Sequence, residues 1–251
     1  WSKKGISPKK ADSNSNHKIL QFQILKASVR AYKNNLNTHN AYAEFREARA
    51  RLREENEKIK ILDVGGEPIF WKDAEIDHSN FDITLINLKQ GEPIFQNMEC
   101  VVGDARDLSR FSDSSFDLVV SNSVIEHVGT WEDQTRMAQH IQRVGKRIFL
   151  QTPNYWFPVE THFVTPFFQY LPVWLRTWLV CNFSLGNYKK TKDWEKAKGY
   201  VTQIELLSKR QMRKLFPNST IENEWLFGMI NGFIITEGWP LDIIGYRKSK
   251  N

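Results

Sequence analysis

Cysteine is scarce in this chain of 251 residues, where only Cys100 and Cys181 occur. The two lie far apart in the sequence, and neither belongs to a cluster of cysteines and histidines. Such usage predicts neither a disulfide framework nor a zinc site, and no metal is expected. A chain so poor in cysteine suits a reducing compartment, so we expect a cytoplasmic protein.

Long apolar runs are absent as well. No stretch of about 18 apolar residues is free of charge, so no transmembrane helix is predicted. No compact block of lysine and arginine is interleaved with aromatic residues, so no nucleic acid partner is expected. The net charge of +6 is interpreted as solvation of helix faces, with an acidic substrate or anionic lipid as the alternative. The first residue is Trp1, and the sequence leaves open both what precedes it and the oligomeric state.

Three segments with different patterns follow one another along the chain. Residues 1–17 are polar and without periodicity, which predicts a flexible tail. Residues 18–58 carry apolar side chains at helical spacing and predict an N-terminal helical extension, broken near residues 34–40. Residues 59–251 form the predicted main domain, in which residues 154–206 are an insertion rich in aromatic side chains.

The main domain alternates short apolar runs with helix or turn signals. Five runs predict buried strands at 59–64, 81–88, 99–104, 116–123 and 146–153. Helices are predicted at 130–144, with Thr130 as the N-cap, and at 207–215. Residues 219–228 and 231–238 predict a closing antiparallel hairpin, with "MI" and the turn-prone Asn231-Gly232 at its turn.

This alternation predicts the fold class. Strands that alternate with helices form a parallel sheet with helices on both faces, and right-handed crossovers make it a doubly wound, Rossmann-like α/β fold. The five strands and the closing pair give a seven-stranded sheet with an antiparallel last strand. Ligands of such sheets bind outside the carboxyl ends of the strands, so the site residues are sought there.

Polar or small residues follow all five of these strands. They are Asp63, Gly65 and Gly66 after the first, Asn87 after the second, Asp104 and Ala105 after the third, "SNSVIEHV" (121–128) after the fourth, and "TPNYWF" (152–157) after the fifth. Glycine lets a backbone approach a ligand closely because it carries no Cβ. The first turn lacks the G-x-G-x-x-G spacing of a dinucleotide-binding loop, which argues against a nicotinamide cofactor.

Four segments of the chain resemble a known family. "ILDVGG", "VVGDARDL", "FDLVVSNSVIEHV" and "RIFLQTPN" are similar to the successive motifs of class I S-adenosylmethionine (SAM)-dependent methyltransferases, the type 11 group in particular. The resemblance covers residues 59–155, and the closing hairpin fits the reversed seventh strand of that family. It implies SAM as the cofactor, and because SAM has no pyrophosphate, one or two glycines suffice in the first turn.

The resemblance also implies a role for each matching residue. Asp63, Gly65 and Gly66 would line the methionine part of SAM, Asp104 would accept a hydrogen bond from the adenine amino group with Ala105 and Arg106 beside it, and Ser121 and Asn122 would lie beneath the sulfonium. Asn87 stands where the family usually has an acidic residue for the ribose hydroxyls, and an amide binds a diol more weakly than a carboxylate does. Glu67, Pro68 and Ile69 depart from the family's D-x-G-x-G-x-G pattern.

Methyl transfer requires an oriented nucleophile, and a hydroxyl nucleophile also benefits from a general base. His127, Glu160 and His162 are the candidates at the carboxyl edge. Each has a structural alternative: His127 as a residue that bonds the backbone beneath the cofactor, His162 as a residue that orders the insertion, and Glu160 as a surface or capping carboxylate. Tyr188 and Lys192 match the Y-x-x-x-K pair of short-chain dehydrogenases, but they lie in a basic loop and are interpreted as a chance match.

The aromatic insertion has three interpretations. Phe167, Phe168, Leu171, Trp174, Leu175 and Trp178 place apolar surface on more than one face of a helix, and Arg176, Lys189, Lys190 and Lys192 add positive charge. The first interpretation is a helical lid that shapes an acceptor pocket. The second is a peripheral membrane contact through residues 163–183, too short and too broken by Pro172 to span a bilayer. The third is a surface for a protein partner.

The sequence thus predicts a SAM-dependent methyltransferase that acts on a small-molecule, glycan or lipid-linked acceptor. A methyltransferase-like binding module without turnover is the alternative outside enzymes, because of the altered glycine turn and Asn87. A nicotinamide-dependent oxidoreductase is the alternative among enzymes.

Overall fold

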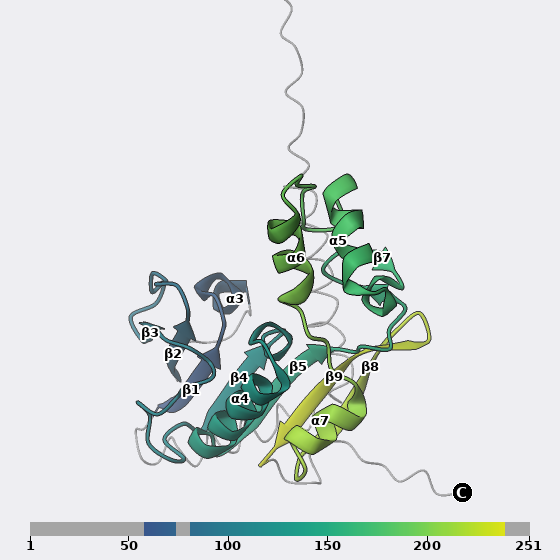
Figure 1. Cartoon of the computed structure of the whole chain (residues 1–251). Coiled ribbons are helices and arrows are strands. Elements are labelled where there is room, and N and C mark those ends of the chain that lie inside the picture. The colour runs from purple at the N-terminus through teal and green to yellow at the C-terminus, as the bar shows by residue number, and fades with distance from the viewer. Residues whose placement is uncertain (1–57, 74–80, 239–251) are drawn as a thin grey trace, which may run out of the picture.

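The computed structural model describes residues 58–73 and 81–238. The tail predicted for residues 1–17 and almost all of the helical extension predicted for 18–58 lie outside the described residues. Within them, seven strands form one sheet in the order β3-β2-β1-β4-β5-β9-β8 (Figure 1). The predicted doubly wound sheet with an antiparallel last strand is therefore confirmed.

Five parallel strands and one antiparallel hairpin make up this sheet. The strands are β1 (Ile59–Val64), β2 (Phe81–Asn87), β3 (Met98–Val102), β4 (Leu118–Asn122), β5 (Ile148–Pro153), β8 (Thr220–Leu226) and β9 (Met229–Glu237). Strand order reverses between β1 and β4, which is where open α/β sheets bind their ligands.

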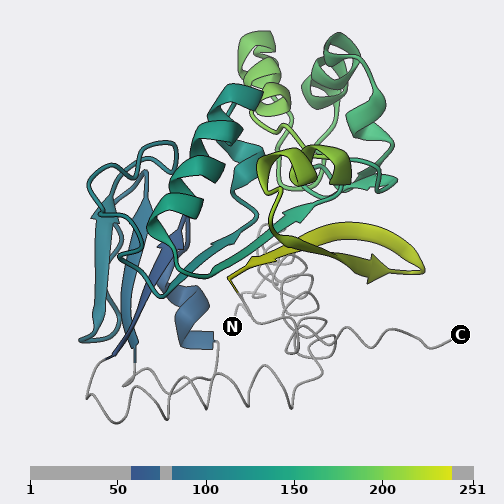
Figure 2. The same ribbon diagram turned by 90° about the horizontal axis from the view of Figure 1, so that it is seen from below.

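Helices cover both faces of the sheet. They are α3 (Pro68–Asp73), α4 (Trp131–Val144) and α7 (Lys209–Leu215), with the 3-10 turn η2 (Ile125–His127) after β4. Helices α4 and α7 lie side by side on one face, and α3 lies on the other (Figure 2). The strands read as nearly continuous apolar runs because the sheet is buried on both sides.

Alternation along β1 divides the core into two layers. Leu62 and Val64 pack with Met137 of α4 and its neighbours, whereas Ile61 packs on the opposite face with Trp71 of α3. Such a fully buried aliphatic side chain contributes roughly 1.5–3 kcal/mol through removal of its surface from water. These two layers fix the sheet and hence the places where its strands end.

Helix α4 begins at its predicted N-cap, whereas α7, predicted at 207–215, begins at Lys209. Thr130 caps α4: its side chain accepts from the backbone N–H of Asp133, and the Asp133 carboxylate accepts from the backbone N–H of Thr130. Ser208 and Gln211 form the same reciprocal pair at α7. Each such cap satisfies helix-end N–H groups and is worth about 1 kcal/mol.

The turn of the closing hairpin lies elsewhere than predicted. Phe227 and Gly228 form it, both with positive φ, and Asn231-Gly232 belongs to β9. Gly232 is required for close approach instead: a Cβ there would lie 2.3 Å from the Glu224 side chain and 3.1 Å from the backbone oxygen of Thr152. A glycine that makes room for a neighbouring strand was thus mistaken for one that permits a turn.

The predicted insertion forms a small unit with its own core, here called the cap (residues 154–206). It holds the hairpin β6 (Val159–Glu160) and β7 (Thr165–Pro166), the 3-10 turn η3 (Phe168–Tyr170), and helices α5 (Val173–Asn182) and α6 (Trp194–Thr202). Phe163 packs with its ring centroid 4.2 Å from that of Phe168 and 4.5 Å from that of Tyr188. Helices α5 and α6 stand beyond the carboxyl ends of β4 and β5 (Figure 1).

Helix α6 was not predicted, although its signals are present. Asp193 caps it by accepting from the backbone N–H of Lys196, and Ala197 and Val201 are buried four residues apart. Two predictions within the cap are also corrected. Phe168 is fully buried rather than part of an apolar outer face, and Arg176 is half-buried rather than directed at lipid headgroups.

The cap leaves and rejoins the sheet at one point. Asn154 and Leu207 pair as an isolated bridge, and the backbone N–H of Tyr155 donates to Leu207 at 3.1 Å. Among the described residues, none of the helices has both the length and the apolar character needed to cross a bilayer.

Gly186→Ala should loosen the cap. Gly186 has φ +51°, and a Cβ would lie 2.3 Å from the backbone oxygen of His162, to which Asn187 donates. A left-handed residue with a Cβ costs roughly 1–2 kcal/mol, and the backbone clash adds to this. We expect a lower thermal unfolding midpoint and faster proteolysis within the cap.

Gly199→Ala provides the matched control. Gly199 lies in α6 with open space where its Cβ would be, so alanine should be neutral or stabilising by up to about 1 kcal/mol. Equal midpoints for the two variants would contradict the role given to Gly186.

Candidate functional site

The turn after β1 is closed by a buried carboxylate. Asp63 is 3% exposed and accepts a hydrogen bond from the indole Nε1 of Trp71 at 2.8 Å. Its carboxylate lies against Gly66, where a Cβ would fall only 1.9 Å from Oδ2. Gly65 has φ +81° and packs against Val124. Both glycines are therefore needed for the turn itself.

Asn87 at the end of β2 is tied to the same turn. Its Nδ2 donates to the backbone oxygens of Gly65 and Gly66, each at 3.2 Å. A carboxylate could not make these bonds because it only accepts. The departure from the acidic residue of the family thus has a structural cause, and Asn87 supports the turn while its Oδ1 is left for other contacts.

Asp104 and Arg106 lie together after β3. The Arg106 guanidinium donates to both oxygens of Asp104, at 2.6–3.0 Å, and Arg106 Nη1 also lies 3.6 Å from Asp133. The Arg106 hydrogen bonds hold the pKa of Asp104 below its usual range. Asp104 keeps a third of its side chain exposed, and Ala105 between them packs against the core beneath.

Ser121 and Asn122 end β4 next to the glycine turn. Ser121 is buried, and its Oγ donates to the backbone oxygen of Val64 at 3.2 Å, so it links β4 to β1 rather than facing an open site. Asn122 is half-buried. The residues predicted for cofactor binding on β1, β2, β3 and β4 therefore all lie along one edge of the sheet.

The structure brings the three catalytic candidates together beyond that edge. The rings of His127 and His162 lie edge to face with centroids 4.7 Å apart. His162 Nδ1 lies 2.7 Å from Oε1 of Glu160, whose other oxygen accepts from the backbone N–H of Phe163 at 2.6 Å. Glu160 is 2% exposed, so its interpretation as a surface carboxylate is wrong, although it does accept a backbone N–H as a capping carboxylate would.

Glu126 completes this cluster. It is fully buried, its Oε2 accepts from the Thr152 hydroxyl at 3.0 Å, and its Oε1 has no hydrogen-bond partner among the described residues. One ligand-type atom each from Glu126, His127 and His162 lies within 4.8 Å of the other two. Glu126 belongs to the segment "SNSVIEHV" that follows β4, but its proximity to His162 could not be read from spacing.

Burial and neighbouring charge set the protonation of the cluster. Partial desolvation of the His127 ring, with the His162 ring beside it, lowers the pKa of His127 to about 4, so this ring is neutral at pH 7. Burial opposes protonation of His162, but Glu160 and Glu126 outweigh it and raise its pKa. Burial raises the pKa of Glu126, which His162 offsets in part.

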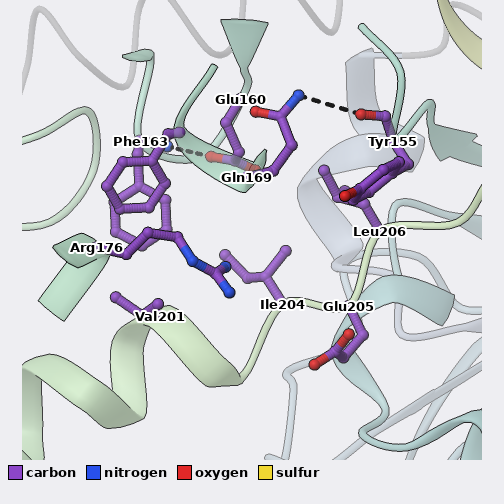
Figure 3. Close-up of a pocket in the computed structure, with 10 residues that line it drawn as sticks. Tyr155, Glu160, Phe163, Gln169, Arg176, Val201, Ile204, Glu205 and Leu206 are labelled. Atoms are coloured by element: carbon purple, nitrogen blue, oxygen red, sulfur yellow. Dashed lines mark hydrogen bonds between the residues drawn. The ribbon is translucent and has the colours of Figure 1, made fainter. Parts of the chain in front are cut away.

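A cavity of about 210 Å³ lies on the other side of Glu160, within the cap (Figure 3). Arg176 reaches from α5 past Val201 toward its middle, and its Nε has no partner among the described residues. Gln169 donates to the backbone of Tyr155, while its buried Oε1 is likewise unpartnered. Neither Arg176 nor Gln169 was predicted as a site residue, because apolar periodicity hides single polar residues that point inward.

Tyr188 and Lys192 lie in a loop, as the interpretation of "YKKTK" as a chance match expects. Tyr188 stacks on Phe163, and its hydroxyl accepts from Gln203 at 2.7 Å. This tyrosine therefore belongs to the packing of the cap.

Asp63→Asn should stabilise the protein in a pH-dependent way. Burial raises the pKa of Asp63 to about 7 from an ordinary 3.8, an effect that the Trp71 hydrogen bond opposes. The folded state then holds a proton that the unfolded state loses, so this group makes stability fall as pH rises from about 4 to 7. Its upper bound is about 4 kcal/mol.

The measurement is urea unfolding of wild type and Asp63→Asn between pH 4 and pH 8. The stability advantage of the variant should be small at pH 4 and largest above pH 7. An advantage that stays constant across this range would show that Asp63 ionises normally.

Asn87→Asp should weaken the glycine turn although it restores the family's usual acidic residue. It removes both donated bonds and sets a carboxylate against two carbonyl oxygens. We expect a lower unfolding midpoint and several-fold weaker SAM binding by titration calorimetry. Tighter SAM binding in Asn87→Asp would mean that the ribose contact dominates at this position.

Part of the chain matches a family of known proteins. Residues 67–147 match the family model described as "Methyltransferase domain". No curated protein matches the sequence significantly.

Several solved structures match part of the chain at low sequence identity. The CurJ carbon methyltransferase is 13% identical with a TM-score of 0.44, and the match covers 72% of this chain and 48% of that one. A SAM-dependent methyltransferase from Methanosarcina mazei is 17% identical with a TM-score of 0.37, covering 72% of this chain and 92% of that one. CrArsM, an arsenic(III) SAM methyltransferase from Chlamydomonas reinhardtii, is 17% identical with a TM-score of 0.39, covering 72% and 62%. The chain thus spans about half the length of the first of these proteins.

The family match covers α3, the strands from β2 to β4, and α4, and it includes Asn87, Asp104 and the dipeptide Glu126-His127. The strand order around it is the one expected from the resemblance, with an antiparallel strand between β5 and β8. Residues 67–147 are therefore similar to a methyltransferase domain, and the strand order of the surrounding sheet agrees with that similarity.

Proposed function

We propose that the protein transfers a methyl group from SAM to a small-molecule acceptor. One observation carries the proposal: the glycine turn after β1, Asp104 after β3 and the histidine pair after β4 and β5 lie along one edge of the same sheet. Cofactor contacts and acceptor contacts would then lie side by side, which is what a reaction between two bound molecules requires.

The cofactor half of the site is assigned to residues at the ends of β1 to β4. Asp63, Gly65 and Gly66 would border the methionine part, and Asn87 would offer its Oδ1 to the ribose. Asp104, Ala105 and Arg106 would border the adenine, and an Asp104 oxygen can accept from its amino group while Arg106 fixes the carboxylate. Ser121 would support the sulfonium region through β4, and Asn122 would face it.

The acceptor half is assigned to the cluster and the cap. The nucleophile would lie against His127 and His162, in line with the methyl–sulfur bond. Glu160 acts through His162 as a positioning residue, because it holds the ring by Nδ1 and leaves Nε2 toward the site. SAM supplies the reactive methyl group, so these residues orient the acceptor and exclude water.

The cavity beside Glu160 suggests a polar acceptor. Arg176 Nε and Gln169 Oε1 offer a donor and an acceptor without partners among the described residues, as a polar ligand group would require. Buried polar groups without partners cost free energy, which a bound ligand can recover. A glycan or a lipid-linked acceptor carries suitable oxygens as well.

A lipid-linked acceptor is the version favoured by one surface feature. Phe167, Trp174 and Trp178 of the cap are 58%, 63% and 47% exposed. Aromatic side chains of this kind suit a contact with the interface of a membrane. Co-sedimentation with vesicles of anionic phospholipid would support that version, and its absence would limit the acceptor to soluble compounds.

Titration calorimetry with SAM tests the cofactor half. We expect saturable binding by wild type, no binding of NADH, and binding by Asp104→Ala that is roughly ten- to hundredfold weaker, since a charge-assisted hydrogen bond is worth about 1.5–3 kcal/mol. Asp107→Ala is the control: this neighbouring carboxylate bonds only locally, to the backbone N–H of Ser109, and should leave SAM binding unchanged.

Failure of SAM to bind at millimolar concentration would overturn the proposal. It would favour a binding module without turnover, for which the tight packing of Asp63 against Gly66 is the relevant observation. Binding of NADH instead would favour an oxidoreductase.

A further inference from the structure

Two histidines and a carboxylate converge where the cap meets the sheet. Glu126 and His127 come from η2 after β4, and His162 comes from the loop after β6. One atom from each side chain lies within 4.8 Å of the others. Residues 35 positions apart in the chain are thus brought together by the return of the cap over the sheet.

Each of the three side chains is held from behind by a further contact. His162 Nδ1 faces Glu160, and because a carboxylate only accepts, the neutral ring carries its proton there and keeps a lone pair on Nε2. His127 makes a hydrogen bond to the backbone of Gln203, and Glu126 Oε2 accepts from Thr152. Outer contacts of this kind orient metal ligands, and a carboxylate behind a histidine is the commonest form.

Glu126 supplies an independent sign of a missing partner. Its side chain is completely buried, yet Oε1 has no hydrogen-bond partner among the described residues. A buried carboxylate oxygen without a partner is costly, so such groups are normally paired or bound to a cation. Two buried carboxylates, Glu126 and Glu160, flank one His162 ring, and a protonated His162 would balance only one of them.

We propose that Glu126, His127 and His162 form a binding site for a divalent transition-metal ion, with zinc as the best match. Two imidazole nitrogens and one carboxylate oxygen are a known ligand set for zinc sites that keep a position open. The same set can hold Fe²⁺ or Mn²⁺. Magnesium and calcium fit less well, because they require mainly oxygen ligands.

Small side-chain movements would bring the ligands to bonding distance. Zinc ligands lie about 2.0–2.2 Å from the ion, which places them about 3.4 Å from one another in a tetrahedron. The three atoms here lie within 4.8 Å, so each needs to move by about an ångström or less. All three side chains keep an outer contact, to Thr152, Gln203 and Glu160, about which shifts of this size can occur, and His127 is the exposed member of the three.

An ion at this point would leave at least one position for another ligand. Under the proposed function, that ligand is an oxygen of the acceptor, which the ion would orient and whose pKa it would lower. The site itself rests only on the cluster, so metal binding and SAM binding can be tested separately.

The test uses tag-free full-length protein that has been stripped with a chelator. Titration with Zn²⁺ should show one equivalent bound, and Co²⁺ should give the visible absorption of a four- or five-coordinate site. Glu126→Gln keeps the size and the Thr152 contact but removes the charge, and should weaken zinc binding at least tenfold. Glu160→Gln should weaken it roughly ten- to hundredfold, as outer-contact variants do.

Two further variants distinguish loss of a zinc ligand from misfolding and from an effect of any histidine substitution. His127→Ala changes a partly exposed side chain and should fold normally while losing zinc affinity, as checked by circular dichroism. His140→Ala changes a histidine of α4 outside the cluster and should bind zinc like wild type. Absence of zinc binding, or equal binding by Glu126→Gln, His127→Ala and wild type, would overturn the proposal whatever SAM does.

Discussion

Burial of carboxylates is the constraint on which the edge of this sheet depends. Asp63, Glu126, Glu160 and Glu224 are each at most 3% exposed. A carboxylate so far from water is tolerated only with a partner, and each of these has one in the described residues: Trp71 for Asp63, Thr152 for one oxygen of Glu126, His162 for Glu160 and Gln151 for Glu224. These contacts dictate the local structure. The Trp71 indole of α3, the His162 ring and the Gln151 amide of β5 must each lie within hydrogen-bonding distance of a buried carboxylate. These contacts help to fix the ends of the strands.

The two halves of the site show this constraint in different forms. On the side proposed for the cofactor, Asp63 packs against Gly66, so the turn needs glycine there and needs Asn87 to donate to its carbonyls. On the side proposed for the acceptor, Glu160 fixes His162, and Gly186 makes room for the backbone of that histidine. Asn87 and Gly186 thus contact neighbours that are distant in the chain, and the departures at Asn87 and in the glycine turn form one arrangement.

The sequence predicted the sheet well because its signals are local. Buried strands appear in the sequence as apolar runs. The start of α4 is recognised from its N-cap, because the capping box joins Thr130 to Asp133, only three positions away. The errors have the opposite cause. Gly232 was taken for a turn residue since the approach of Glu224 from the next strand leaves no trace in spacing. The edge residues could be chosen by their position after strands, but the approach of Glu126 and His127 to His162, which is distant in the chain, depends on how the cap folds back.

The bridge between Asn154 and Leu207 separates the cap from the sheet, so the two parts of the chain can be considered independently. Because the cap begins and ends at adjacent backbone positions and packs around its own aromatic core, its internal sequence can vary while β5 and α7 keep their places. Closing a segment between fixed neighbouring ends costs chain entropy that rises only slowly with length. The sheet edge can therefore stay constant in evolution while residues 155–206 are replaced or lengthened, so the surface that faces Glu126 and His127 can change without disturbing the strands that hold them.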